Sequence, residues 1–160
     1  MIINNNLCYG ISLLINSHIY NNVTSSYWLS GLTECVVENN FIGASLSSCS
    51  NCSFNNNAFT TDFTFPVGSN TGSKNLMNQT TQQTFEVNDL SLPKNLRIRT
   101  TSPCKNAGTD GTDIGIFGGP APYKPGAVPF NPHITQSAIS AQTDKDGNLK
   151  VNIQVSAQTR

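Results

Sequence analysis

The sequence predicts an all-β chain: a parallel β-solenoid of a few coils, followed by a Pro-rich linker and a β-hairpin. Three observations support this prediction: an Asn-containing unit that recurs along the chain, short stretches with apolar residues at every second position, and an unusual composition. Asn, Ser and Thr number 21, 17 and 16 among 160 residues, whereas only 11% of residues are charged. Coiled coils and helical bundles would need Glu, Lys, Arg, Ala and Leu instead.

The unit that recurs is apolar-x-Asn-Asn-x-apolar, and two copies of it align at a shift of 17 residues. In this alignment Cys35 falls on Cys52 and Val37 falls on Phe54. The next four residues, Asn39, Asn40, Phe41 and Ile42, fall on Asn56, Asn57, Ala58 and Phe59. Upstream, Leu14–Ile19 fits the same frame at a shift of 22 from Val37. Ile2–Leu7 is a further copy or a second face of the same coil.

This unit has a specific physical interpretation. Alternation such as Ile11, Leu13 and Ile15 places every second side chain on one face, as a strand requires. Asn then turns the chain, because it tolerates left-handed backbone angles. Coils that stack about 4.8 Å apart bring equivalent Asn side chains into a hydrogen-bonded ladder. The match of Cys35 with Cys52 predicts a stack of inward-facing sulfur atoms.

Two other repeat and all-β architectures fit less well. A leucine-rich repeat would show its regular Leu pattern, which this chain lacks. A β-sandwich also has short strands and turns, but it does not predict matching residue types at a shift of 17.

The register is lost after residue 59. Residues 60–84 predict a further coil with a long side loop, because 68–73 are Gly, Ser, Asn and Thr in composition. Residues 85–98 contain two strand-like pieces around Pro93. The segment 101–119 then ends the repeat region.

That last segment resembles a known family. It contains Ser-Pro-Cys-Lys-Asn-Ala-Gly at 102–108 and Asp-Ile-Gly-Ile-Phe-Gly-Gly at 113–119. With the Asn-rich repeats, it is similar to the last coil of right-handed parallel β-helix repeat proteins of Bacteroidetes-type bacteria. The resemblance implies a β-helix over residues 1–119, preceded by further coils that this chain lacks. It also implies a secreted or cell-surface location.

The C-terminal part differs in composition. Five of residues 120–132 are Pro, which cannot donate to a strand ladder, so an extended linker is expected there. Within 133–160, residues 144–148 read as a hairpin turn and Leu149–Ala157 alternates strictly between apolar and polar. Ile134–Ala141 is the expected partner strand. Since two strands alone are marginal in water, we expect the hairpin to dock on the solenoid, pair with another chain or begin a further domain.

The charge pattern excludes several function classes. Lys plus Arg and Asp plus Glu number nine each, so no basic field exists for nucleic acid or an anionic membrane. No apolar run approaches the roughly 20 residues of a membrane span, and the N-terminus does not have a signal-peptide pattern. We therefore expect no nucleic-acid partner and no membrane insertion.

Catalytic groups are sparse. Residues 1–73 contain no Lys or Arg, which disfavours a polysaccharide lyase, an enzyme that needs a base and usually Ca²⁺. Glu34 and Glu38 have the even spacing of a shared strand face, as a glycosidase pair would require, but solvated strand positions explain them better. His18 and His133 are isolated. We expect no catalytic residue in this chain.

Other polar motifs are best explained structurally. Asp110–Asp113 fits turn geometry better than a calcium loop. Arg97-Ile98-Arg99 reads as a solvated strand with Ile98 inward. We expect no metal site and no cofactor.

The five cysteines leave two alternatives open. Their odd number argues against a closed disulfide framework, and Cys49-Ser-Asn-Cys52 lacks the second ligand pair of a zinc site. Buried, reduced thiols are the favoured interpretation, and one disulfide is the alternative.

Tyr27 and Trp28 are the candidate ligand-binding residues. They follow Asn21–Ser26, interpreted as an insertion that lengthens the first coil, and aromatic rings on such a loop could stack on sugars. The sequence thus predicts a non-catalytic structural or glycan-binding segment of a surface protein, with polysaccharide as partner. Self-association through the open solenoid end or the hairpin is also expected. The alternative is the C-terminal tail of a carbohydrate-active enzyme whose active site lies upstream.

Overall fold

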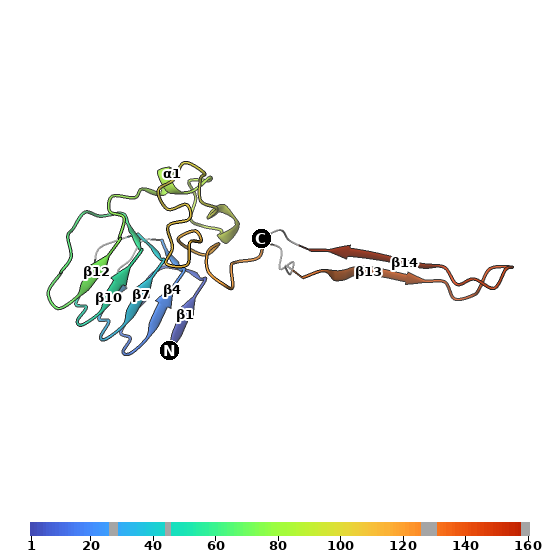
Figure 1. The fold of residues 1–160 in the computed structure, drawn as a ribbon, viewed down its shortest axis with the longest axis horizontal. Helices are drawn as coiled ribbons and strands as arrows, with labels where there is room; N and C mark the ends of the chain where they lie inside the picture. Colours follow the sequence, from blue (N-terminus) through green and yellow to red (C-terminus); the bar gives the residue numbers. More distant parts are fainter. Residues whose placement is uncertain (26–28, 44–45, 126–130, 158–160) are drawn as a thin grey trace. The chain divides into compact units, whose positions relative to one another are not determined.

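Three parallel sheets wind through residues 1–76 and form a β-solenoid, as Figure 1 shows for the strands of the largest sheet. The computed structural model describes residues 1–25, 29–43, 46–125 and 131–157. The chain divides into two compact units, Met1–Tyr123 and Lys124–Arg160. The first contains the solenoid and the second contains an antiparallel hairpin, so both predicted folds are confirmed.

The coils contribute five short strands to sheet A, four to sheet B and three to sheet C. Sheet A contains β1 (Ile2–Asn4), β4 (His18–Tyr20), β7 (Val36–Glu38), β10 (Ser53–Asn55) and β12 (Thr71–Ser73). Sheet B contains β2 (Leu7–Cys8), β5 (Val23–Thr24), β8 (Phe41–Ile42) and β11 (Ala58–Phe59). Sheet C contains β3 (Ile11–Ser12), β6 (Leu29–Ser30) and β9 (Leu46–Ser47).

The register confirms the predicted shift of 17 residues, because Val37 pairs with Phe54. The steps between the other coils are 16 and 18 residues. The prediction for the upstream coil was wrong: Ile19, and not Ile15, pairs with Val37. Asn21 and Asn22 therefore belong to the repeat and not to an insertion. The chain offers two similar Asn-bearing segments within one coil, and the sequence alone does not show which one lies above Val37.

The predicted Asn ladder is present at the turn between sheets A and B. The Oδ1 atom of each ladder Asn after Asn6 accepts hydrogen bonds of 2.8–3.1 Å from the backbone N–H and the side-chain amide of the Asn one coil earlier. The side-chain amide of each ladder Asn also donates to a backbone carbonyl, as Asn40 does to Ile19 at 2.9 Å. The ladder consists of Asn6, Asn22, Asn40, Asn57 and Asn75. It satisfies turn groups that no sheet ladder reaches.

The residue before each ladder Asn has a left-handed backbone. Its φ lies between 51° and 58° in Asn5, Asn21, Asn39, Asn56 and Lys74. Asn adopts this conformation at low cost because its short polar side chain can bond locally. We call the first four of these residues the outer Asn row.

Residues 104–119, which we call the strap, run back across the coils along the outer Asn row. Asn56 donates to the Ala107 carbonyl at 2.8 Å, and Asn39 donates to Thr109 Oγ1 at 2.9 Å. Asn21 then donates to the carbonyls of Asp113 and Gly115, and Asn5 to those of Ile116 and Gly118. The expectation that this segment forms the last coil was therefore wrong. It packs sideways on four coils, so its contacts are not periodic.

Gly119 shows why the strap ends in glycine. Its φ is 77°, and a Cβ atom there would lie 2.7 Å from Asn21 Oδ1. A larger residue would be strained in backbone and would displace the Asn.

The strap and the segment before it enclose a second core. The inner core lies within the coils and contains Ile11, Ile19, Leu29, Leu32, Cys35, Val37, Ile42, Cys52, Phe54 and Phe59. The outer core lies on the other side of sheet B and contains Val23, Phe41, Ala58, Phe85, Leu96, Ile98, Cys104, Ile114 and Ile116. Sheet B is thus buried on both faces, whereas the outer side of sheet A stays uncovered by this segment.

Residues 77–98 differ from the two strands predicted around Pro93. They form a short helix α1 (Thr81–Thr84), a 3₁₀ turn (Pro93–Asn95) and a single antiparallel bridge between Phe85 and Ile98. Apolar residues in this segment face the outer core without forming a continuous ladder. The inward position predicted for Ile98 is confirmed, since it is 4% exposed.

We expect the buried Asn residues of the ladder to contribute more to the free energy of unfolding than the exposed one. Replacing Asn40 by Ala leaves the buried Asn22 N–H without its acceptor and removes one donor to the Ile19 carbonyl. We expect the free energy of unfolding to fall by about 3 kcal/mol or more, measured by urea denaturation. The matched variant Asn6→Ala, at the exposed end of the ladder, should cost about 1 kcal/mol or less. Equal losses in the two variants would contradict this ranking.

The outer Asn row should hold the strap in place. Asn39→Gly keeps the left-handed turn but removes the hydrogen bonds between this side chain and Thr109. We expect faster amide hydrogen exchange in residues 107–115 and faster tryptic cleavage after Lys105. Asn16→Gly is the control, because Asn16 has the same backbone conformation (φ 47°) and lies on a different turn. Unchanged exchange in Asn39→Gly would show that the outer core alone holds the strap.

Candidate functional site

The outer side of sheet A presents two straight rows of side chains, which we call the sheet A face. The pairing of β1, β4, β7, β10 and β12 aligns equivalent residues along the solenoid axis. Successive strands lie about 4.8 Å apart, so each row repeats at that interval. One row contains Ile2, His18, Val36, Ser53 and Thr71, and the other contains Asn4, Tyr20, Glu38, Asn55 and Ser73.

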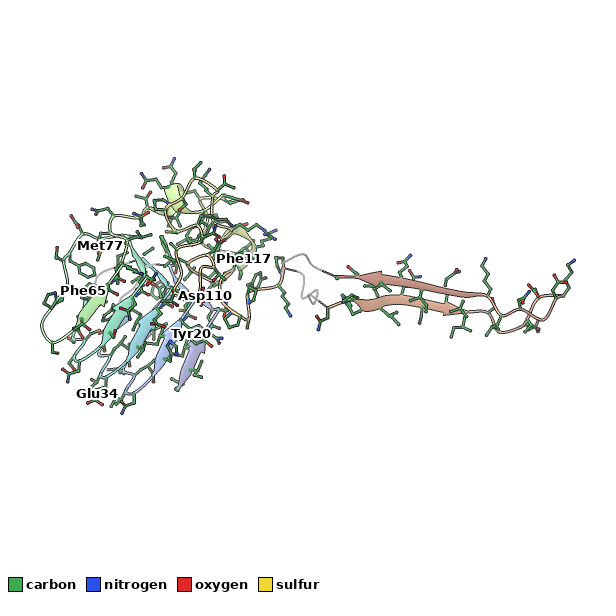
Figure 2. All side chains as sticks on the ribbon, in the orientation of Figure 1. Tyr20, Glu34, Phe65, Met77, Asp110 and Phe117 are labelled. Atoms are coloured by element: carbon green, nitrogen blue, oxygen red, sulfur yellow. The ribbon has the colours of Figure 1, made fainter. Side chains whose placement is uncertain are left out.

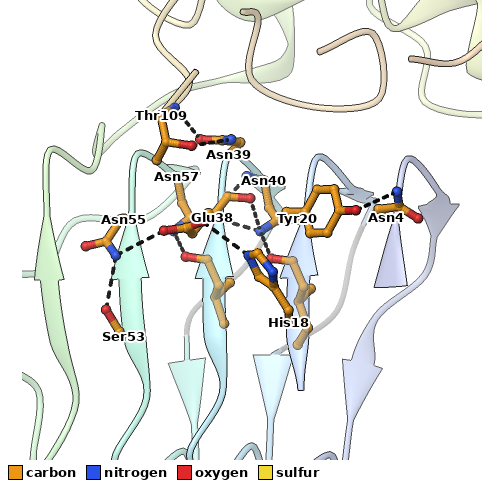
Figure 3. A network of polar contacts seen from close by, with 12 residues as sticks. Asn4, His18, Tyr20, Glu38, Asn39, Asn40, Ser53, Asn55, Asn57 and Thr109 are labelled. Atoms are coloured by element: carbon orange, nitrogen blue, oxygen red, sulfur yellow. Dashed lines mark hydrogen bonds and ion pairs between the residues drawn. The ribbon is translucent and has the colours of Figure 1, made fainter. Parts of the chain in front are cut away.

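Hydrogen bonds across the coils connect this face, as Figure 3 shows. Asn4 donates to the Tyr20 hydroxyl at 3.0 Å. His18 Nε2 lies 3.2 Å from Glu38 Oε2, and the imidazole ring lies 4.7 Å from the Tyr20 ring. Asn55 donates to Glu38 Oε1 at 3.4 Å. The network restrains the rotamers of these side chains.

The network leaves part of each side chain accessible. The side chain of His18 is 43% exposed and that of Glu38 is 23% exposed. Tyr20, Asn4 and Asn55 are also partly exposed. An ordered, partly exposed set of an aromatic ring, amides and a carboxylate can stack on a ligand ring and bond its hydroxyl groups.

His18 looks isolated in the sequence, so this site is not predicted from it. His18 and Glu38 are 20 residues apart, and they meet only because Tyr20 pairs with Glu38 on the neighbouring strand. The corrected register was the signal that could have found the pair. Only a shift of 18 places His18 and Tyr20 beside Glu38.

Glu34 and Glu38 do not share a strand face, and of the two strand positions predicted only that of Glu38 is correct. Glu34 lies in the turn before β7 with φ 53°, so its even spacing does not place it on the strand face (Figure 2). Glu38 is the one carboxylate on the strands of the sheet A face. The face therefore lacks the carboxylate pair of a glycosidase.

The proposed ligand residues Tyr27 and Trp28 lie outside the described residues. The structure thus neither brings them to the sheet A face nor separates them from it.

The other polar motifs are structural. Asp110 accepts hydrogen bonds from the Thr112 N–H and hydroxyl at 3.0 and 2.7 Å, which is turn geometry. Asp113 accepts from the Asn106 N–H and forms an ion pair with Lys105 at 2.9 Å. Among the described residues no group of three His, Cys, Asp or Glu side chains could hold a metal ion.

A shallow groove of about 670 Å³ lies beside α1. Its lining includes the amides of Asn78, Gln79, Gln82 and Gln83 together with Arg99. The Arg99 guanidinium donates to the carbonyls of Gln82 and Glu86, so its charge is used in holding this segment. The groove is a weaker candidate than the sheet A face.

The cysteine thiols are free and mostly buried. The predicted sulfur stack is confirmed for Cys35 and Cys52, because the Cys35 N–H donates to the Cys52 sulfur at 3.4 Å. Burial raises the pKa of Cys52 and of Cys104 above the ordinary thiol value. These thiols therefore act as small apolar core groups and not as nucleophiles.

Comparison with protein-family models, curated proteins and solved structures gives no match to this chain. Across the described residues, no helix has the length and apolar character needed to cross a membrane. The chemistry of the chain must accordingly be inferred from its own residues.

The thiols provide a test of the packing. A raised pKa leaves less thiolate at pH 8, and burial blocks access, so Cys52 and Cys104 should react with iodoacetamide at least about 100-fold more slowly in the native protein than in urea. Mass spectrometry of the labelled peptides measures both rates. Rapid labelling of Cys104 in the native protein would contradict a closed outer core.

Proposed function

We propose that this chain is a non-catalytic glycan-binding segment of a surface β-solenoid protein, and that the sheet A face is its contact surface. The observation that supports this most directly is the pre-ordered row Asn4, Tyr20, Glu38 and Asn55. It offers one aromatic ring flanked by amide and carboxylate groups at a regular spacing. Sugars are recognised by this combination, because a pyranose has an apolar face and a rim of hydroxyl groups.

Charge narrows the ligand class. The strands of sheet A lie within residues 1–73, which contain Glu34, Glu38 and Asp62 but no Lys or Arg. A polyanionic chain such as a uronate or a sulfated glycan would meet the Glu38 carboxylate and no Lys or Arg on the strands of sheet A. The ligand proposed here is a neutral or amino-substituted polysaccharide, whose ammonium groups Glu38 would attract.

The same residues argue for binding and against catalysis. Hydrolysis of a glycosidic bond needs two carboxyl groups on opposite sides of that bond, and the described part of the sheet A face supplies one. The alternative proposal, a C-terminal tail of a carbohydrate-active enzyme, places the reacting groups in coils outside this chain. A secreted or surface location and a bacterial source are further parts of the proposal and rest on the family resemblance.

The test is binding to a panel of immobilised glycans that includes neutral, amino-substituted and polyanionic polysaccharides. We expect binding to neutral or amino-substituted chains, and a loss of about tenfold (about 1.4 kcal/mol) in Tyr20→Ala. Glu38→Gln should weaken the amino-substituted ligand selectively. Tyr9→Ala is the matched control, because Tyr9 is 62% exposed and lies outside the strands of sheet A.

Three outcomes would overturn the proposal. A preference for polyanionic chains would contradict the charge argument, and equal losses in the Tyr20 and Tyr9 variants would exclude the sheet A face. Cleavage of any of these polysaccharides by the chain would show that it is an enzyme.

A further inference from the structure

The C-terminal unit contains an antiparallel hairpin of β13 (His133–Ile139) and β14 (Val151–Ser156). The predicted turn at 144–148 is confirmed, since the Asp144 N–H donates to the Asn148 carbonyl at 2.9 Å. The Asp144 carboxylate accepts from the N–H groups of Asp146 and Asn148, and these bonds lower its pKa. The turn therefore holds the two strands in one register.

A register shift between Ile134 and Gln136 sorts the side chains of the hairpin by polarity. Ile134 and Ile139 are five residues apart, so regular alternation would place them on opposite faces. Because of the shift, each of these isoleucines lies directly opposite a valine of β14: Ile134 pairs with Val155, and Ile139 pairs with Val151. Such an irregularity re-aims side chains at a defined point.

The result is a hairpin with two unlike faces, because directly opposed residues share a face. One face, here called the apolar hairpin face, consists of Ile134, Ser137, Ile139, Val151, Ile153 and Val155. The other consists of His133, Gln136, Ala138, Asn152, Gln154 and Ser156. The apolar hairpin face contains no charged group.

This face is uncovered. Its five aliphatic side chains are 48–65% exposed, from Val151 to Ile139. Side chains of this size and exposure present on the order of 500 Å² of apolar surface, at the upper end for the largest patch on a soluble monomer. Two such faces packed together would bury on the order of 1,000 Å² in total, about the minimum for a specific stable interface.

We propose that the apolar hairpin face packs against the same face of a second copy of this chain. A two-fold contact brings one surface against itself, so each aliphatic row meets an aliphatic row and no charge is buried. The product is a four-stranded, two-layer β structure. A single hairpin is marginal in water, and the second layer supplies the core that it lacks. This proposal is independent of the glycan proposal.

The experiment is sedimentation velocity on the full chain over a range of concentrations. We expect a species of twice 17.2 kDa that dissociates on dilution. Ile153→Lys places a charge in the centre of the interface on both copies, and should weaken dimerisation at least about 100-fold. Gln154→Lys is the matched control on the opposite face, and should change the dissociation constant less than about threefold.

Circular dichroism and the urea transition of the solenoid check that Met1–Tyr123 is unchanged in both variants, since the substitutions lie in the separate C-terminal unit. A monomeric wild-type chain at about 100 μM would overturn the proposal. A dimer that persists in Ile153→Lys, or one lost equally in Gln154→Lys, would overturn it also, because another surface would then form the contact. Glycan binding by the monomeric variant would still test the sheet A face by itself.

Discussion

The two adjacent asparagines at the turn between sheets A and B are the feature on which the rest of the solenoid depends. At this corner the backbone leaves the ladders and enters the interior, where an unpaired N–H or carbonyl costs about 1–3 kcal/mol. The inner Asn supplies both an acceptor and a donor to the coil before it, as Asn40 does for Asn22 and Ile19. The outer Asn adopts the left-handed turn that lets the inner one point inward. The inner role depends on the length of the Asn side chain, whereas Lys74 takes the outer position before Asn75.

The same corner also attaches the strap to the coils. Within a solenoid each coil contacts only its neighbours. Here the outer Asn row binds the strap, and the strap carries Ile114 and Ile116 onto sheet B. Sheet B is thereby buried on both faces. Lateral packing thus adds contacts that stacking of the coils alone does not supply.

Covering sheet B on the strap side leaves the sheet A face as a flat, ordered surface of side chains. Its rows are regular because the spacing between coils is fixed. Its hydrogen-bond network is not repeated from coil to coil, because each strand has different residues at the paired positions. The hairpin forms a second kind of surface, apolar and uncharged, made by a single register shift. The two surfaces have opposite chemistry, so the proposals for a glycan and for a second copy do not compete.

The sequence by itself determined the solenoid, the 17-residue register between Val37 and Phe54, the Asn ladder, the sulfur stack and the hairpin turn. These features follow from backbone periodicity and local turn chemistry, which depend only on residues within one or two coils of each other. Only the tertiary structure decided which residues of the upstream coil lie beside Glu38, and so brought His18 to it. Asn16 and Asn21 both have a left-handed backbone, so the sequence contains two similar candidates for the turn. It also decided the course of the strap, whose contacts with the outer Asn row join residues 51 to 113 positions apart. Such contacts have no period, since they depend on which carbonyls reach the row once the coils are stacked.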